Sequence, residues 1–153
     1  MNIMNVRRNV MNKQSITSIK RILDVNINRA REGLRVIEDY ARFVLNDREL
    51  TGNIKTVRHI ISKAIDRFDL VSSRDSEKDL GRAPAFDKKI KAKTLKNVII
   101  ANIVRVEESA RVLEEFSKVI YPESTVSFKK ARFLLYDLEK KFIKKAKRHL
   151  RDN

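Results

Sequence analysis

The chain contains one segment twice, and this repetition limits the folds that it can adopt. Residues 26–44 read NINRAREGLRVIEDYARFV, and residues 102–120 read NIVRVEESARVLEEFSKVI. At an offset of 76, identical residues occupy equivalent places, among them Asn26 and Asn102, Arg29 and Arg105, Glu32 and Glu108, and Arg35 and Arg111. An internal repeat of this length indicates a fold assembled from two similar units.

Apolar residues in both copies recur with the period of an α-helix. In the first copy the apolar face consists of Ile27, Ala30, Leu34, Ile37, Tyr40, Ala41 and Val44. Polar residues interrupt this face at equivalent places, with glutamates at its edge: Asn26, Arg29, Gly33 and Glu32, then Asn102, Arg105, Ser109 and Glu108. A buried arginine needs an anion beside it. The pattern therefore favours either two buried Arg–Glu–Asn clusters that dock similar helices, or an anion site between the copies.

Each repeated helix is followed by a second amphipathic segment. Apolar residues at helical spacing predict a helix that ends near Leu70, and a matching helix over about residues 125–150. The two align at an offset of 74. We therefore predict a single all-α domain over residues 1–153. It is a pseudo-two-fold bundle of two helix hairpins, with repeat one at about 18–70, a loop at 71–93 and repeat two at about 94–150. A dimer in which hairpins associate between chains is the alternative.

Local signals predict where the helices start and stop. Hydroxyl residues at 15–18 are expected to cap the first helix, which runs to Leu45 and stops at residues 46–47. Residues 121–124 are expected to connect the last two helices, because Pro122 stops the earlier one. Residues 1–14 are expected to be irregular.

Composition excludes several kinds of site. The chain has no cysteine, two histidines and three glycines, so disulfides, thiolate or histidine-rich metal sites and glycine-rich phosphate loops are excluded. No apolar run approaches bilayer length and no signal-peptide core is present, so we expect a soluble cytoplasmic protein without a membrane partner. The net charge of +15 suits anionic partners. Nucleic acid is disfavoured, because no helix-turn-helix spacing or aromatic-rich strand is visible.

The connection between the halves carries charged residues that suit a ligand. Arg74 and Asp75 are followed by Asp79. This segment is either a polar connection or a clamp, with Arg74 for an anion and an aspartate for a metal. Arginines and carboxylates together fit phosphoryl transfer, and they fit simple binding of a phosphorylated ligand equally well. His59 on the second helix is either a partly exposed bundle residue or a catalytic one.

Across roughly residues 18–140 the sequence resembles a known family. The resemblance lies in the segments RILDVNINRAREGLRVIEDYARFVL, VRHIIS, RDSEKDLG, ANIVRVEESARVLEEF and LYDLEK. These look like the compact helical hydroxymethylpyrimidine-phosphate kinase of thiamine biosynthesis, a domain often fused N-terminal to thiamine-phosphate synthase. The resemblance implies phosphorylation of 4-amino-5-hydroxymethyl-2-methylpyrimidine phosphate to the pyrophosphate, with ATP and Mg²⁺. No synthase barrel follows, which implies the standalone form or an excised domain.

The resemblance also implies roles for individual residues. As catalytic residues that contact phosphates or assist transfer it suggests Arg29, Arg105, Arg58, His59 and Arg74. As substrate-binding residues it suggests Asn26, Asn102, Glu32, Glu108 and Gly33, the two glutamates also being candidates to orient arginines or hold Mg²⁺. As metal ligands it suggests Asp75 and Asp79. We expect ion pairs at Arg35, Glu38, Arg111 and Glu114.

Two other functions remain open from the sequence. One is a non-catalytic module that binds a phosphorylated ligand or nucleic acid, and the other is an interaction-only partner of a thiamine enzyme. The sequence is compatible with a homodimer and with a functional link to thiamine-phosphate synthase.

Overall fold

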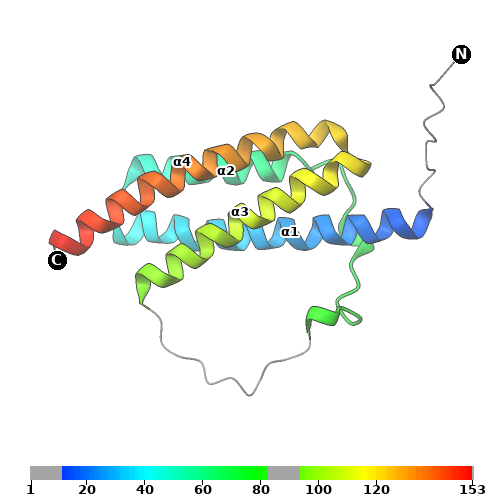
Figure 1. Cartoon of the computed structure of the whole chain (residues 1–153), viewed down its shortest axis with the longest axis horizontal. Coiled ribbons are helices and arrows are strands. Elements are labelled where there is room, and N and C mark those ends of the chain that lie inside the picture. Colours follow the sequence, from blue (N-terminus) through cyan, green and yellow to red (C-terminus); the bar gives the residue numbers. More distant parts are fainter. Residues whose placement is uncertain (1–11, 83–93, 153) are drawn as a thin grey trace, which may run out of the picture.

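The computed structural model describes residues 12–82 and 94–152 of the chain (Figure 1). These residues form helices and no strand, which confirms the all-α class. The α-helices are α1 (Lys13–Asp39), α2 (Arg48–Lys63), α3 (Leu95–Ile120) and α4 (Pro122–Asp152). A π-helical turn, η1 (Tyr40–Val44), extends α1, and two 3₁₀ turns, η2 (Val71–Ser73) and η3 (Leu80–Arg82), lie after α2.

The α-helices pack as a bundle, with α1 against α2 and α3, and α4 against α2 and α3. Figure 1 shows α1 and α2 running in opposite directions, as do α3 and α4, while α3 crosses α1 obliquely. The apolar face expected on the first helix is buried from Ile27 to Ala41, whereas Val44 in η1 is exposed. The four-helix bundle is thus confirmed, and the two-fold axis between its halves stays a prediction.

The first helix begins earlier than expected. Asn12, and not a hydroxyl residue at 15–18, caps it by accepting a 2.8 Å hydrogen bond at Oδ1 from the Ser15 backbone N–H. Asparagine satisfies a free helical N–H as well as serine does. The break after Leu45 is confirmed, because Asn46 has a φ of 48° and Asp47 caps α2 by accepting a 2.8 Å hydrogen bond from Leu50.

Two other predicted boundaries were wrong. α2 ends at Lys63 and not near Leu70, although Ile65, Phe68 and Leu70 still pack against the core from a series of turns. The spacing of apolar residues indicates which side chains are buried and not whether the backbone stays helical. Here a series of turns buries the side chains that were expected on a longer helix. Pro122 begins α4 instead of stopping α3, because proline is tolerated where a helix needs no backbone N–H.

Buried glutamates link the helices within each half. The Glu38 carboxylate on α1 lies 3.2 Å from Arg58 Nε on α2, and Glu114 on α3 lies 2.6 Å from Arg132 Nε on α4. Both glutamates also pair along their own helices, which confirms the expected ion pairs at Arg35, Glu38, Arg111 and Glu114. None of the helices in the described ranges has a stretch both long and apolar enough to cross a bilayer.

Candidate functional site

A cleft of about 720 Å³ lies between α1 and the segment after η2. We call it the α1 cleft. The charged residues that line it are Arg21, Asp24, Arg29, Glu32, Arg74, Asp75, Lys78 and Asp79. The structure therefore brings together five residues that the sequence suggested: Arg29, Glu32, Arg74, Asp75 and Asp79. Sequence reasoning missed Arg21, Asp24 and Lys78. Arg21 and Asp24 follow the helical period that leads to Arg29 and Glu32, and this period was the available signal.

A bidentate ion pair fastens one wall of the cleft to the other. Arg74 donates from Nε and Nη2 to the two carboxylate oxygens of Asp24, at 2.7 Å each. Asp24 is buried, whereas Arg74 is about half exposed. The hydrogen bonds to Asp24 and the charge of that carboxylate raise the pKa of the Arg74 guanidinium. The guanidinium group of Arg74, which was expected to contact a phosphate, thus binds a carboxylate of the chain in this structure.

A second contact holds the same segment. Arg21 Nη2 lies 3.1 Å from the Asp75 carboxylate and donates a 3.3 Å hydrogen bond to the Asp75 carbonyl oxygen. The Lys78 backbone N–H donates to Asp75 Oδ1 at 3.4 Å. Asp79, in turn, accepts a 2.8 Å hydrogen bond from the Gly81 N–H. Asp75 therefore orders the segment, and the more exposed Asp79 keeps one carboxylate oxygen available.

The remaining charges in the α1 cleft have no partner. Among the residues that the structure describes, the side chains of Arg29, Glu32 and Lys78 form no hydrogen bond or ion pair. All three are exposed to solvent. Once Asp24 and Asp75 have paired with arginines, two cations (Arg29 and Lys78) and two carboxylates (Glu32 and Asp79) of the cleft are left without an ion pair among the described residues. Such a site can bind an anion without first breaking an internal ion pair.

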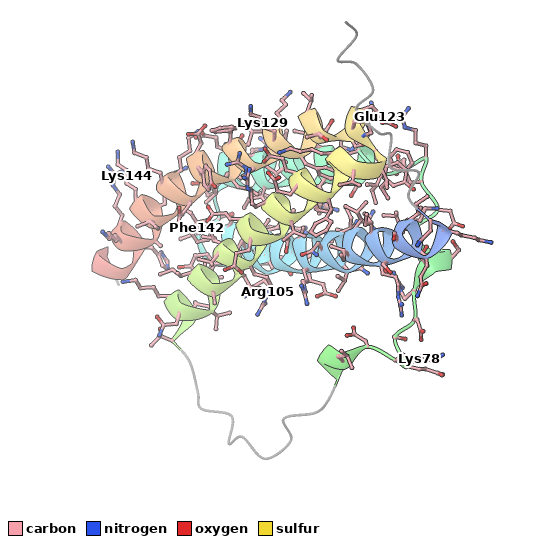
Figure 2. All side chains as sticks on the ribbon, turned by 45° about the vertical axis from the view of Figure 1, so that its right-hand side comes forward. Lys78, Arg105, Glu123, Lys129, Phe142 and Lys144 are labelled. Atoms are coloured by element: carbon pink, nitrogen blue, oxygen red, sulfur yellow. The ribbon has the colours of Figure 1, made fainter. Side chains whose placement is uncertain are left out.

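Arg105 lies where α3 passes α1 (Figure 2). Its Nη1 donates a 3.0 Å hydrogen bond to Asn102 Oδ1. A Cβ added at Gly33 of α1 would lie 3.1 Å from the Asn102 carbonyl oxygen and 2.6 Å from Val106 Cγ2. Gly33 is therefore required for the close approach of the two helices, which accounts for it without a substrate contact.

The two repeated asparagines belong to the helix interface. Asn26 and Asn102 are buried, and each amide donates a 2.8 Å hydrogen bond to the carbonyl four residues earlier. Arg29 and Arg105 are exposed, as are Glu32 and Glu108. The prediction of buried Arg–Glu–Asn clusters was therefore wrong: the arginines lie on the rim of the apolar face, where their long side chains reach solvent.

The suggested residues of α2 lie elsewhere. Arg58 forms an ion pair with buried Glu38 at 3.2 Å. His59 is exposed and lines a different cleft. The lining of the α1 cleft also lacks five suggested residues of α1 and α3, namely Asn26, Gly33, Asn102, Arg105 and Glu108. Within the described residues, no three histidine or acidic side chains are grouped closely enough to hold a metal ion by themselves.

The sequence was also compared with known proteins. Residues 21–141 match the sequence model of the ThiD2 family. The chain is 39% identical over 129 residues to the thiamine-phosphate synthase of Synechocystis sp., covering 84% of this chain and 37% of that protein. The corresponding protein of Rhodopirellula baltica is 38% identical over 122 residues, covering 78% of this chain and 32% of that protein. The chain thus spans about a third of these curated relatives, and no solved structure matches significantly.

Proposed function

The chain belongs to the ThiD2 family, and from this membership we propose that it phosphorylates 4-amino-5-hydroxymethyl-2-methylpyrimidine phosphate to the pyrophosphate, with ATP as donor. Relatives named thiamine-phosphate synthase support a role in thiamine biosynthesis. The reaction itself is suggested by the motifs that resemble the helical kinase. The observation that carries the proposal is that two cations of the α1 cleft, Arg29 and Lys78, form no ion pair among the described residues.

The cleft suits the acceptor substrate in size and in chemistry. A volume of about 720 Å³ lies within the range of small-molecule sites. Arg29 and Lys78 would neutralise the phosphate, and Ile22, Val25 and Leu80 line the same cleft. Leu80 is almost fully exposed, so its side chain is free to cover an aromatic pyrimidine ring. The free alcohol lacks the phosphate and would leave both cations unpaired.

The chemistry of this acceptor makes few demands on the protein. In the proposed transfer an oxygen of the acceptor phosphate forms a bond to the γ-phosphorus of ATP, and the bond from that phosphorus to the β-phosphate oxygen breaks. The attacking oxygen is already ionised at neutral pH, so the site needs no strong general base. Positioning and charge neutralisation are then the main contributions of the chain, and in this proposal Arg29 and Lys78 would supply both.

The residues present fit a magnesium ion carried by the nucleotide. Glu32 has no partner among the described residues, and Asp79 accepts a single hydrogen bond. Mg²⁺ is usually held by one or two carboxylates together with phosphate oxygens and water, so Glu32 and Asp79 are the residues that would hold it. Bound there, Mg²⁺ would neutralise charge on the transferring phosphate.

Release of ADP tests the proposal directly. The purified chain is incubated with ATP, Mg²⁺ and either the pyrimidine monophosphate or the free alcohol. We expect ADP with the monophosphate only, and a loss of at least about a hundredfold in kcat/KM for Arg29→Ala. The matched control is Arg148→Ala, an exposed arginine on α4 outside the cleft, which should retain activity.

Two outcomes would count against the proposal. Full activity of Arg29→Ala would show that the α1 cleft is not the site of transfer. Absence of ADP release from the wild-type chain, with thermal protection by the monophosphate retained, would instead indicate a binding module without the chemistry.

A further inference from the structure

A second cleft lies between α2 and α4 and shares no lining residue with the α1 cleft. It has a volume of about 630 Å³ and includes the end of α2 and the beginning of α4. Figure 2 labels Glu123 at this end of the bundle. We call it the α2–α4 cleft. Its charged lining residues are His59, Lys63, Asp66, Arg67, Glu123 and Lys130.

Positive charge in the α2–α4 cleft exceeds negative charge. Arg67 and Glu123 form an exposed ion pair at 3.5 Å and so offset one another. Within the part of the chain that the structure describes, the side chains of His59, Lys63, Asp66 and Lys130 form no hydrogen bond or ion pair, which leaves two lysines against one carboxylate. Cations that share a cleft repel one another, and an anion bound between them would relieve that repulsion.

The other end of the same helix pair provides an internal comparison. A smaller cleft of about 130 Å³ lies there, also between α2 and α4. At the offset of 74 that aligns the second helices of the two halves, six of its seven lining residues correspond to residues of the α2–α4 cleft, which is also lined by His59, Asp66, Glu123 and Ser124. The pairs that differ most are Thr56 with Lys130, Asp137 with Lys63, and Leu138 with Ala64.

These differences affect both the size and the charge of the cleft. Alanine at 64 leaves more room than leucine does at 138, and the α2–α4 cleft also extends past the end of α2 to Asp66 and Glu123. Lysines at 63 and 130 replace an acid and a neutral hydroxyl residue, so the enlarged cleft is also positive. The same two helices also pack at the smaller cleft, where leucine replaces the alanine and neither lysine is present, so helix packing does not require these residues.

We propose that the α2–α4 cleft binds the polyphosphate group of a small molecule. Lys63 on α2 and Lys130 on α4 both line the cleft, and His59 lies one turn before Lys63 on α2. Ile60 and Ala64 supply an apolar floor for the rest of a ligand. The proposal concerns binding and does not depend on the kinase reaction. It also assigns a place to His59, which the α1 cleft does not include.

The two histidines of the chain make a direct test accessible. In proton NMR the Cε1–H signal of His59 is identified by its absence from His59→Gln. We expect inorganic pyrophosphate to shift this signal saturably in the wild-type chain and in Arg29→Ala. A nucleoside triphosphate forms the second arm. Tighter binding of the nucleotide would assign the cleft to nucleotides, and equal binding would assign it to pyrophosphate groups in general.

A pair of double variants makes the test specific to the cleft. Lys63→Asp with Lys130→Thr introduces the residues of the smaller cleft and should weaken pyrophosphate binding by at least about tenfold. Lys144→Asp with Lys129→Thr makes the same change in charge at exposed positions of α4 outside the cleft (Figure 2), and should weaken it much less.

Either of two results would overturn the proposal. The first is a His59 signal that does not shift saturably with pyrophosphate or nucleotide in the wild-type chain. The second is an equal loss of binding in both double variants, since pyrophosphate would then respond to the overall charge alone. All the substituted side chains are exposed, so circular dichroism should show the same helix content in both variants.

Discussion

Asp24 on α1 accepts two hydrogen bonds of 2.7 Å from Arg74, which lies 50 residues later in the chain. This pair connects the two walls that the described residues give the α1 cleft, one helical and one a connecting segment. Because the Asp24 carboxylate is buried and Arg74 is half exposed, the pair acts as an anchor for the segment. The position of Lys78 opposite Arg29 therefore depends on a residue that need not touch the substrate.

Asp24→Asn is expected to release the segment while leaving the bundle folded. The amide removes the charge that holds the Arg74 fork. The KM for the pyrimidine phosphate should rise about tenfold, and proteolytic cleavage within residues 74–82 should become faster. Asp39→Asn, an exposed change on the same helix outside the cleft, is the matched control. An unchanged KM and unchanged cleavage would show that Asp24 does not position the segment.

Gly33→Ala should destabilise the bundle. The added Cβ would lie 2.6 Å from Val106 Cγ2 and 3.1 Å from the Asn102 carbonyl, and Val106 is fully buried. Overpacking of this kind costs roughly 1–3 kcal/mol. Gly52→Ala on α2 is the control, because no atom lies within 4 Å of its added Cβ. That change should stabilise the chain by about 0.5–1 kcal/mol. Urea denaturation measures both, and equal effects would contradict the close approach.

Glu107 should make the chain less stable as the pH rises. Burial, followed by the charges of Glu139 and Glu108, raises its pKa from 4.5 to about 7. One of its carboxylate oxygens is buried without a hydrogen-bond partner among the described residues. The folded state therefore holds a proton that the unfolded state releases above about pH 4.5, and stability is lost as the pH rises from there to about 7.

Glu107→Gln removes this titration. The variant should unfold at a higher temperature than the wild-type chain at pH 8, by a few degrees, and at nearly the same temperature at pH 5. Thermal melts followed by circular dichroism at both pH values measure the difference. A variant that gains equally at both pH values would show that packing, and not protonation, is responsible.

Glu114 should affect the pH dependence of stability in the opposite direction, and Glu114→Gln tests this. Hydrogen bonds from Arg132 lower the pKa of the buried Glu114 carboxyl, so its contribution to stability is present above the unfolded pKa and is lost as the pH falls below it. At pH 7 the change should cost roughly 2–4 kcal/mol, because Arg132 loses its partner. Glu115→Gln, on the exposed side of the same helix, serves as the control in urea denaturation. A cost that does not shrink in acid would refute the electrostatic explanation.

The helical period indicated which residues share a face but not which residues meet across faces. Ile27 and Leu34 were placed in the core correctly, because burial on an amphipathic helix follows its period. Arg58 was assigned to a phosphate, whereas it pairs with Glu38 on another helix. Gly33 was assigned to substrate, whereas it admits Val106. In each case the missing information was the neighbour supplied by a different helix.

The sequence by itself determined an all-α chain, the faces of its helices that are buried, and the break at Asn46, because these depend on residues close together along the chain. The tertiary structure alone decided that Arg74 meets Asp24, that Arg21 meets Asp75, and that no described residue pairs with Arg29 or Lys78. The physical reason is that an ion pair requires two charges within about 4 Å, and local periodicity does not determine distances between residues 50 positions apart.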